Sequence, residues 1–180
     1  MSRIFNMDET LMCFKLPSSR SLKFTGSLTV PVRTCAAEKC SITVVLSVAA
    51  DGTKLSPKVV FKGVRTPRDL VVPNSLRISF HKKVWMDESG LKEWIHKCLP
   101  RTRNHEQSLL VWHSFQAHLI DDVKVALRQG KIDVAVIPGG LTLVLQPLDK
   151  CLNKPFKDSV RNKYLAWMIS GPLDYTPSGN

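Results

Sequence analysis

The stretch from residue 41 to residue 62 constrains the fold most strongly. Ser41–Ala49 reads SITVVLSVA, nine residues that are rich in β-branched side chains and apolar on both faces, which predicts a buried strand. Asp51 and Gly52 follow at once, and an Asp-Gly pair between apolar runs favours a hairpin in which both turn residues adopt positive φ. Residues 55–62 form the returning strand. With a shorter candidate strand at 29–34, the sequence predicts an antiparallel meander.

Hydrophobic periodicity in the rest of the chain predicts strands that alternate with helices. A helix is predicted over 87–99, because Leu91, Trp94 and Ile95 share a face and Pro100 stops the helix. The other predicted elements are strands at 3–7, 76–80, 109–112 and 133–137 and helices at 119–129 and 148–169. This order predicts one α/β domain over residues 1–170, a mixed sheet with flanking helices, and a flexible tail at 171–180.

The last predicted helix has two distinct faces. Pro155 is compatible with a helix only near its start, so the helix begins or kinks there. Three basic residues share one face, either as a solvated surface or as a stripe that contacts phosphates: Lys154, Lys157 and Arg161. The apolar face consists of Phe156, Val160, Tyr164, Trp167 and Met168.

Composition limits the class of protein and its partners. The formal net charge is +11 and the pI about 9.7, an excess that favours an anionic partner, most simply nucleic acid. No apolar run approaches the ~20 residues of a membrane span, so no membrane partner is expected. Five scattered cysteines indicate a reducing compartment, and their spacing matches no compact zinc module.

Three positions in the chain point to one polar site. The apolar run 109–112 is too short for a helix, is typical of a fully buried strand, and is followed at once by His113. Asp8 follows the first strand, and Asp149 opens the last helical region. An Asp at position 113 would complete three carboxylates, the usual set for two divalent cations in phosphodiester chemistry. Histidine occupies that position, so the chemistry of the site depends on it.

Several motifs occur in one fixed order and carry a family resemblance. They are NMDET, TVVLSVAADGTKLSP, VVFKG, WMDESGLKEWI, AHL, VAVIPGGLT, LQPLDK and NKPFKDSVRNKYLAWM. Over residues 3–170 the chain resembles the catalytic core of the pogo and Tigger DNA transposases, a group of DDE superfamily endonucleases. The resemblance implies a ribonuclease H-like fold, cut-and-paste transposition in active members, and divalent metal, Mg²⁺ or Mn²⁺.

The acidic residues of that family transfer to this sequence one at a time. The first falls on Asp8 in NMDET and the third on Asp149 in LQPLDK, and the resemblance implies that both bind metal. The second position holds His113, where the family pattern has Asp. The amino-terminal helix-turn-helix region of the family is missing from these residues. The first predicted strand starts almost at the first methionine, and a central strand at that position indicates that something upstream was lost or belongs to another exon.

His113 weakens the expected enzyme. Magnesium prefers oxygen ligands, whereas imidazole suits zinc or manganese better. Losing one metal position removes activation of the nucleophile or of the leaving group, and ~4 kcal/mol of barrier already lowers the rate about a thousandfold. The sequence therefore predicts a catalytically impaired, transposase-derived domain in the nucleus with nonspecific, phosphate-driven affinity for DNA. The alternatives are an active metal-dependent endonuclease, a homo-oligomeric or other protein-interaction module, and a fragment of a decayed element.

Other chemically capable residues have structural interpretations. Asp87, Asp121 and Asp122 are expected at helix starts, where acids are stabilised. Glu9 is either a neighbour that supports the site or a solvated acid, and His118 is expected to pack at a helix entry. The tryptophans are expected in the core rather than as base-stacking platforms: Trp85, Trp94, Trp112 and Trp167.

Overall fold

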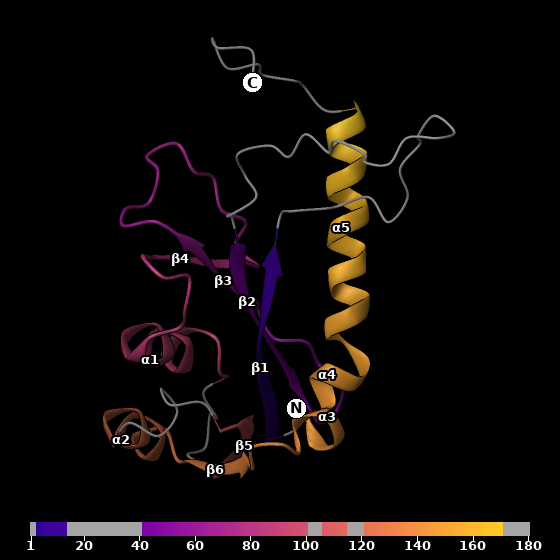
Figure 1. The fold of residues 1–180 in the computed structure, drawn as a ribbon. Helices are drawn as coiled ribbons and strands as arrows, with labels where there is room; N and C mark the ends of the chain where they lie inside the picture. The colour runs from indigo at the N-terminus through magenta and orange to yellow at the C-terminus, as the bar shows by residue number, and fades with distance from the viewer. Residues whose placement is uncertain (1–2, 14–40, 101–105, 115–120, 171–180) are drawn as a thin grey trace.

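A six-stranded mixed sheet forms the centre of the molecule, with strand order β4-β3-β2-β1-β5-β6 (Figure 1). The structure, a computed structural model, describes residues 3–13, 41–100, 106–114 and 121–170. The predicted strand at 29–34, the tail at 171–180 and His118 lie outside these ranges. The strands are β1 Ile4–Cys13, β2 Ser41–Ala49, β3 Lys58–Lys62, β4 Arg77–His81, β5 Ser108–His113 and β6 Ile132–Ile137. The helices are α1 Glu88–Lys97, α2 Asp121–Gln129, α3 Thr142–Leu145, α4 Pro147–Cys151 and α5 Asn153–Ser170.

Strand direction decides which ends of the strands meet. β2 is antiparallel to both β1 and β3, whereas β4 is parallel to β3, and β5 and β6 continue parallel to β1. Five of the six strands of this sheet therefore run in one direction, and their carboxyl ends lie along one edge of the sheet. The predicted antiparallel pairing of β2 with the returning strand is confirmed.

The hairpin after β2 is confirmed, but the predicted turn type is wrong. Gly52 has φ +85°, whereas Asp51 is not in the positive-φ region. The amide of Gly52 donates to the carbonyl of Ala49 at 2.9 Å, and Ala49 donates to Thr53 at 2.8 Å. The loop thus has three residues, with one glycine in the left-handed region, which suits a bulged hairpin rather than a two-residue turn. A side-chain acceptor on Asp51, 3.0 Å from the amide of Thr53, stabilises it.

The two faces of the sheet carry separate apolar clusters. The larger cluster packs β-strand residues such as Met7 and Val45 against α1 and α2 and encloses Trp94 and Trp112, which are fully buried. The smaller cluster, around Val44 and Val59, lies on the other face, where Phe156 of α5 packs against it. Figure 1 shows α1 and α2 on one side of the sheet and α5 on the other. Because side chains alternate along a strand, the even-numbered residues of β1 face α5.

Two strand predictions need correction. β1 does not end before Asp8 but continues through it to Cys13, because nine residues of β1 pair with β2. The predicted fully buried strand, β5, instead alternates between buried and half-buried residues. Its half-buried residues lie on the face of the sheet opposite α1 and α2.

The predicted single helix over 148–169 is two helices, α4 and α5, and a short helix that was not predicted comes before them. This short helix is α3, Pro147 opens α4, and α5 starts at Asn153 with Pro155 in its first turn, where a missing amide costs nothing. The apolar face of α5 is half-buried at Phe156, but Trp167 is 54% exposed. Trp85 is 60% exposed, so the core assignment is confirmed for Trp94 and Trp112 and wrong for Trp85 and Trp167.

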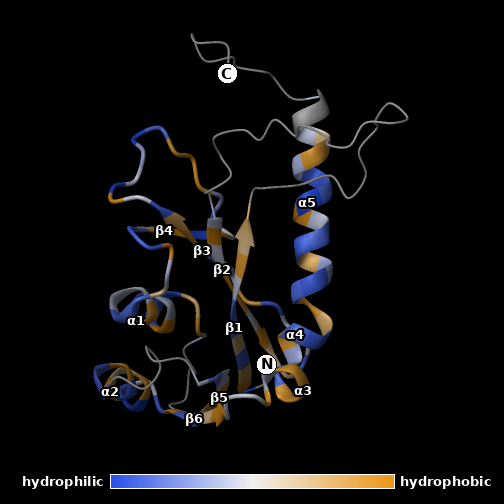
Figure 2. Ribbon diagram, in the orientation of Figure 1, coloured by the Kyte–Doolittle hydropathy of each residue, from blue (hydrophilic) through white to orange (hydrophobic). Residues whose placement is uncertain are grey.

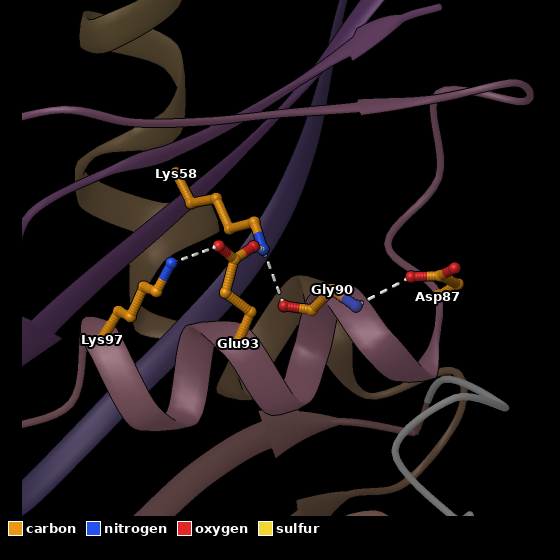
Figure 3. Close-up of polar contacts among 5 residues, drawn as sticks. All are labelled: Lys58, Asp87, Gly90, Glu93 and Lys97. Atoms are coloured by element: carbon orange, nitrogen blue, oxygen red, sulfur yellow. Dashed lines mark hydrogen bonds and ion pairs between the residues drawn. The ribbon is translucent and has the colours of Figure 1, made fainter. Parts of the chain in front are cut away.

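The helix ends follow the acidic residues that the sequence marks. Asp87 is the N-cap of α1 and its side chain accepts from the amide of Gly90 at 2.8 Å (Figure 3). Asp121 and Asp122 occupy the first turn of α2. Of the helices in the described ranges, none is both long and apolar enough to cross a membrane.

Candidate functional site

The candidate site is built around Asp8, which lies in the middle of β1. The residue is 5% exposed and its even position directs it to the face of the sheet that carries α5. A carboxylate buried there needs donors, because an unpaired buried charge is strongly destabilising. Two side chains, from β5 and from the start of α5, approach its two oxygens.

His113 approaches the first oxygen from the neighbouring strand. β5 is parallel to β1, and Asn6 is aligned with Val111. Two residues further along both strands, Asp8 and His113 therefore emerge on the same face. The Nδ1 atom of His113 lies 3.3 Å from Oδ1 of Asp8. The sequence-based expectation that position 113 and Asp8 belong to one site agrees with this contact.

Asn153 occupies the space between the two candidate metal-binding carboxylates. Its Nδ2 atom donates to Oδ2 of Asp8 at 2.6 Å and to Oδ1 of Asp149 at 2.7 Å. Asp149 lies on α4, one helical turn before Asn153, and is exposed. One amide group thus bridges Asp8 and Asp149. Sequence reasoning missed Asn153, although its spacing of four residues from Asp149 was a signal that both side chains lie on one helical face.

A buried amide pair anchors α4 to the strands. Gln146, fully buried, donates to the carbonyl of Met7 at 3.0 Å and accepts from Nδ2 of Asn6 at 2.8 Å. Asn6 also donates to the carbonyl of Val111 at 2.9 Å. These bonds join β1, β5 and the start of α4, so they position Asp149 beside Asp8. Neither amide was recognised from the sequence, although Gln146 stands within the LQPLDK motif.

The site stabilises a negative Asp8 and a positive His113. Burial alone raises the pKa of Asp8, but contacts with His113, Asn153 and Gln146 bring it below its usual value. The contact with Asp8 raises the pKa of His113, burial opposes that rise, and the nearby carboxylates of Glu9 and Asp149 add to it. Both pKa shifts favour the ion-paired state, in which Asp8 is negative and His113 is positive.

The donor set does not fit a pair of divalent metals. The described residues contain no group of three or more His, Cys, Asp or Glu side chains that could hold a metal ion. Both oxygens of Asp8 already face nitrogen donors, His113 and Asn153. Hard cations need several oxygen ligands, and this site offers Asp8 and Asp149 with an amide donor between them.

The remaining candidate residues lie at different distances from this centre. Glu9 follows Asp8 along β1, so strand alternation directs it to the opposite face of the sheet. Lys154 and Arg161 are exposed and Lys157 is half-buried on α5. The three basic residues lie on the helix that also supplies Asn153, and α5 is mostly hydrophilic along its length (Figure 2).

Comparisons with known proteins give consistent results. A family model described as DDE superfamily endonuclease matches residues 39–179, a range that includes His113 and Asp149 and begins after Asp8. Two proteins named Pogo transposable element with KRAB domain, from Mus musculus and Homo sapiens, are each 34% identical over 183 aligned residues. That alignment covers 100% of this chain, which spans 30% of the length of each relative.

Two further matches are more distant. Pogo transposable element with ZNF domain, from Homo sapiens, is 26% identical over 123 residues, which cover 67% of this chain and 9% of the relative. Among solved structures, a pre-cleavage Mos1 transpososome superposes with a TM-score of 0.56 at 14% identity, covering 93% of this chain and 48% of that chain. The shared fold confirms the predicted ribonuclease H-like mixed sheet with flanking helices.

Proposed function

This chain belongs to the DDE superfamily endonuclease family, and we propose that it is a transposase-derived domain that binds DNA and is impaired in metal-dependent cleavage. The observation that carries the impairment is the contact of 3.3 Å between His113 and Asp8. DDE superfamily nucleases typically use divalent metals, which activate the attacking water and stabilise the leaving oxygen when bound. In this chain, a histidine whose pKa is raised by the contact lies against the carboxylate that such a metal would need.

Electrostatics explains why His113 disfavours metal at Asp8. A divalent cation would have to displace His113 or lie beside it, and His113 in its protonated form repels a cation strongly at short range where water is scarce. Asn153 adds a second obstacle, because its amide donates to Asp8 and Asp149 at the same time. The charge of Asp8 is therefore already balanced by its neighbours. For Asp8 and Asp149 to bind a metal ion, the contacts of Asp8 with His113 and Asn153 would first have to break.

DNA binding is proposed from charge and placement. The net charge of +11 favours a polyanion. Lys154, Lys157 and Arg161 follow one another at three- and four-residue spacing, so they line one side of α5 and match a run of phosphates. We assign these contacts to the DNA backbone without base specificity, and a nuclear location follows from DNA as the partner.

Calorimetric titration of Mn²⁺ and Mg²⁺ tests the impaired site. The native chain is compared with His113→Asp, which restores a third carboxylate, and with His113→Asp combined with Asp149→Ala. Native protein is expected to bind Mg²⁺ at least about tenfold more weakly than His113→Asp, a difference of about 1.4 kcal/mol. The double variant is expected to lose that gain. Equal Mg²⁺ affinity of the native chain and His113→Asp would contradict the proposed role of His113.

Self-association is a second candidate function, favoured by α3. Leu143 is 78% exposed, Val144 66% and Leu145 52%, so this short helix presents apolar side chains to solvent. Figure 2 shows α3 in the colour of hydrophobic residues. Exposed apolar clusters of this kind commonly mark protein interfaces. Sedimentation of the native chain and of Leu143→Lys at several concentrations tests it. A dimer that Leu143→Lys dissociates supports a homo-oligomeric interface, and a native monomer at every concentration excludes one.

A further inference from the structure

Two loops at the carboxyl ends of β3 and β4 carry a concentrated positive charge. Between residue 62 and residue 83 the chain has six Lys or Arg residues and one Asp. All six basic side chains are exposed. Lys62 is the last residue of β3, Arg65 and Arg68 lie in the loop between β3 and β4, and Lys82 and Lys83 lie in the turn between β4 and α1. The sixth, Arg77, is the first residue of β4 and lies at the other end of that strand.

Strand pairing brings the starts of the two loops together. β3 and β4 are parallel, and Lys62 is aligned with His81. The amide of Gly63, the first residue of the loop after β3, donates to the carbonyl of His81, the last residue of β4, at 3.2 Å. Lys62 therefore lies beside His81, one residue before Lys82. The loop after β3 extends beyond the strands and lies apart from α5 (Figure 1).

These charges are not neutralised within the part of the chain that the structure describes. None of the six basic side chains forms an ion pair there, in contrast to α1. On α1, Lys92 pairs with Glu88 at 2.6 Å and with Asp122 at 3.1 Å, and Lys97 pairs with Glu93 at 2.8 Å. The structural lysines Lys92 and Lys97 thus form ion pairs with carboxylates. The lysines at the ends of β3 and β4 retain their full charge for an anionic partner.

A tryptophan stands beside the two lysines of the second loop. Trp85 is 60% exposed and follows Lys82, Lys83 and Val84 directly. Val84 is buried, and its φ of +61° lies in the left-handed region that β-branched residues avoid. Its carbonyl accepts a buried hydrogen bond of 2.6 Å from Oγ1 of Thr43. The sheet thus holds the turn in a strained conformation, and such strain is found disproportionately at functional sites.

We propose that these loops bind a single strand of nucleic acid, with phosphates on Lys62, Lys82 and Lys83 and one base stacked on Trp85. Exposed aromatic rings close to basic residues are the pattern by which proteins hold unpaired strands, and Trp85 follows Lys82 and Lys83 here. The surface adds a base-stacking contact to the proposed DNA binding by α5 and is separate from it. Strand spacing and register place Lys62 roughly 20 Å from Asp8, toward the carboxyl edge of the same sheet.

Fluorescence anisotropy with a labelled oligothymidylate and a labelled duplex of equal length tests this surface. Trp85→Ala is expected to weaken oligothymidylate binding about tenfold and to change duplex binding less than twofold, since base stacking contributes about 1–3 kcal/mol. Trp85→Phe is expected to retain most of the affinity. Lys82→Gln/Lys83→Gln is expected to weaken binding of both probes. A labelled oligouridylate, compared with oligothymidylate, shows whether the strand is RNA or DNA.

Matched controls separate this surface from α5. Trp167→Ala removes the other exposed tryptophan and is expected to leave oligothymidylate affinity unchanged. If Trp85→Ala has no effect while Lys157→Gln/Arg161→Gln weakens duplex binding, this inference is wrong and the proposed function stands. If native protein binds neither probe, both are wrong. If Trp85→Ala alters only self-association, the surface binds protein and the inference is likewise wrong.

Circular dichroism verifies that each variant is folded. If Trp85→Ala is not folded, oligothymidylate binding by Lys82→Gln/Lys83→Gln decides whether the inference holds.

Discussion

At the scale of single residues, one amide nitrogen organises the candidate site. Asn153 is 5% exposed and donates to both Asp8 and Asp149. Asp8 is buried in the sheet, so a lost donor leaves a carboxylate oxygen without compensation. Hydrogen bonds to charged groups contribute more than neutral ones, about 1.5–3 kcal/mol each. The stability of the domain and the geometry of its site are therefore linked through this side chain.

The first prediction concerns that amide. Asn153→Ala is expected to lower the free energy of unfolding by about 2 kcal/mol, because Asp8 loses a charge-assisted donor. Asn162→Ala, at an exposed position of the same helix, is expected to change it by less than ~0.5 kcal/mol. Urea unfolding followed by circular dichroism measures both. Equal effects of the two substitutions would show that Asn153 matters only as a helix residue.

At the scale of elements, a buried lysine connects β3 to α1. Lys58 is 1% exposed, and its Nζ donates to the carbonyl of Gly90 at 2.8 Å and pairs with Glu93 at 2.6 Å (Figure 3). Lys97 approaches the other oxygen of Glu93 at 2.8 Å. A buried ion pair offsets the cost of its desolvation only when both partners are present. Removing Glu93 and removing Lys58 are therefore expected to change stability by different amounts.

The second prediction uses that asymmetry. Glu93→Gln leaves the charge of Lys58 buried without its counter-ion and is expected to cost about 3 kcal/mol of stability. Lys58→Met replaces the buried charge with an apolar side chain of similar length, while Glu93 keeps Lys97, so a cost below ~1 kcal/mol is expected. Chemical denaturation of both variants measures the difference. A larger loss for Lys58→Met than for Glu93→Gln would contradict this account.

The third prediction follows from the pKa of Glu93. Burial alone raises this pKa, but the ion pairs with Lys58 and Lys97 bring it below its ordinary value of 4.5. A carboxylate with a lowered pKa in the folded state stabilises the fold fully above the unfolded pKa, and this contribution is lost as the pH falls through the folded pKa. The stability difference between native protein and Glu93→Gln is therefore expected to shrink below pH 4.5.

Unfolding midpoints across acidic pH measure that difference. Glu88→Gln serves as the control, because Glu88 forms a more exposed i,i+4 pair with Lys92 on the same helix. Its effect is expected to stay below ~0.5 kcal/mol throughout. A Glu93→Gln effect that is constant from neutral to acidic pH would mean that the ion pair does not govern this linkage.

At the scale of the whole molecule, the distribution of charge separates binding surfaces from structural ones. The carboxylates of α1 and α2 are largely paired with lysines, whereas the basic residues of the β3 and β4 loops, and those of α5 apart from the half-buried Lys157, are exposed. Counterions released from DNA by such cations make binding strongly dependent on salt. The net positive charge is therefore expected to bind DNA through these particular surfaces rather than through the whole molecule.

The fourth prediction measures the contribution of α5. Combining Lys154→Gln, Lys157→Gln and Arg161→Gln is expected to reduce the salt dependence of duplex binding by about three units of slope in a log–log plot. The matched control replaces Lys92, Lys97 and Lys124 with Gln, three lysines that are already paired with carboxylates. That control is expected to change the slope by less than one unit, and equal changes in both variants would mean that only net charge matters.

Much of the fold and part of the site were predictable from the sequence. β2, its hairpin and α1 depend on local preferences, such as β-branched side chains, an Asp-Gly pair and an N-cap at Asp87, so their patterns predicted them. The motifs also indicated Asp8, His113 and Asp149 as one group. The turn type after β2 and the division between α4 and α5 were harder to predict. Single residues such as Gly52 and Pro147 are compatible with more than one turn or helix start.

The sequence by itself therefore determined most of the strands and helices, although not α3 or the division between α4 and α5, and it showed which residue replaces the expected acid at position 113. Only the tertiary structure decided that Asn153 lies between the carboxylates, that His113 pairs with Asp8, and that Trp85 is exposed while Trp94 is buried. The physical reason is the distance along the chain over which each kind of interaction acts. Local propensity acts over a few residues, whereas burial and ion pairing depend on strands and helices far apart in the chain, whose contacts exist only once the sheet has formed.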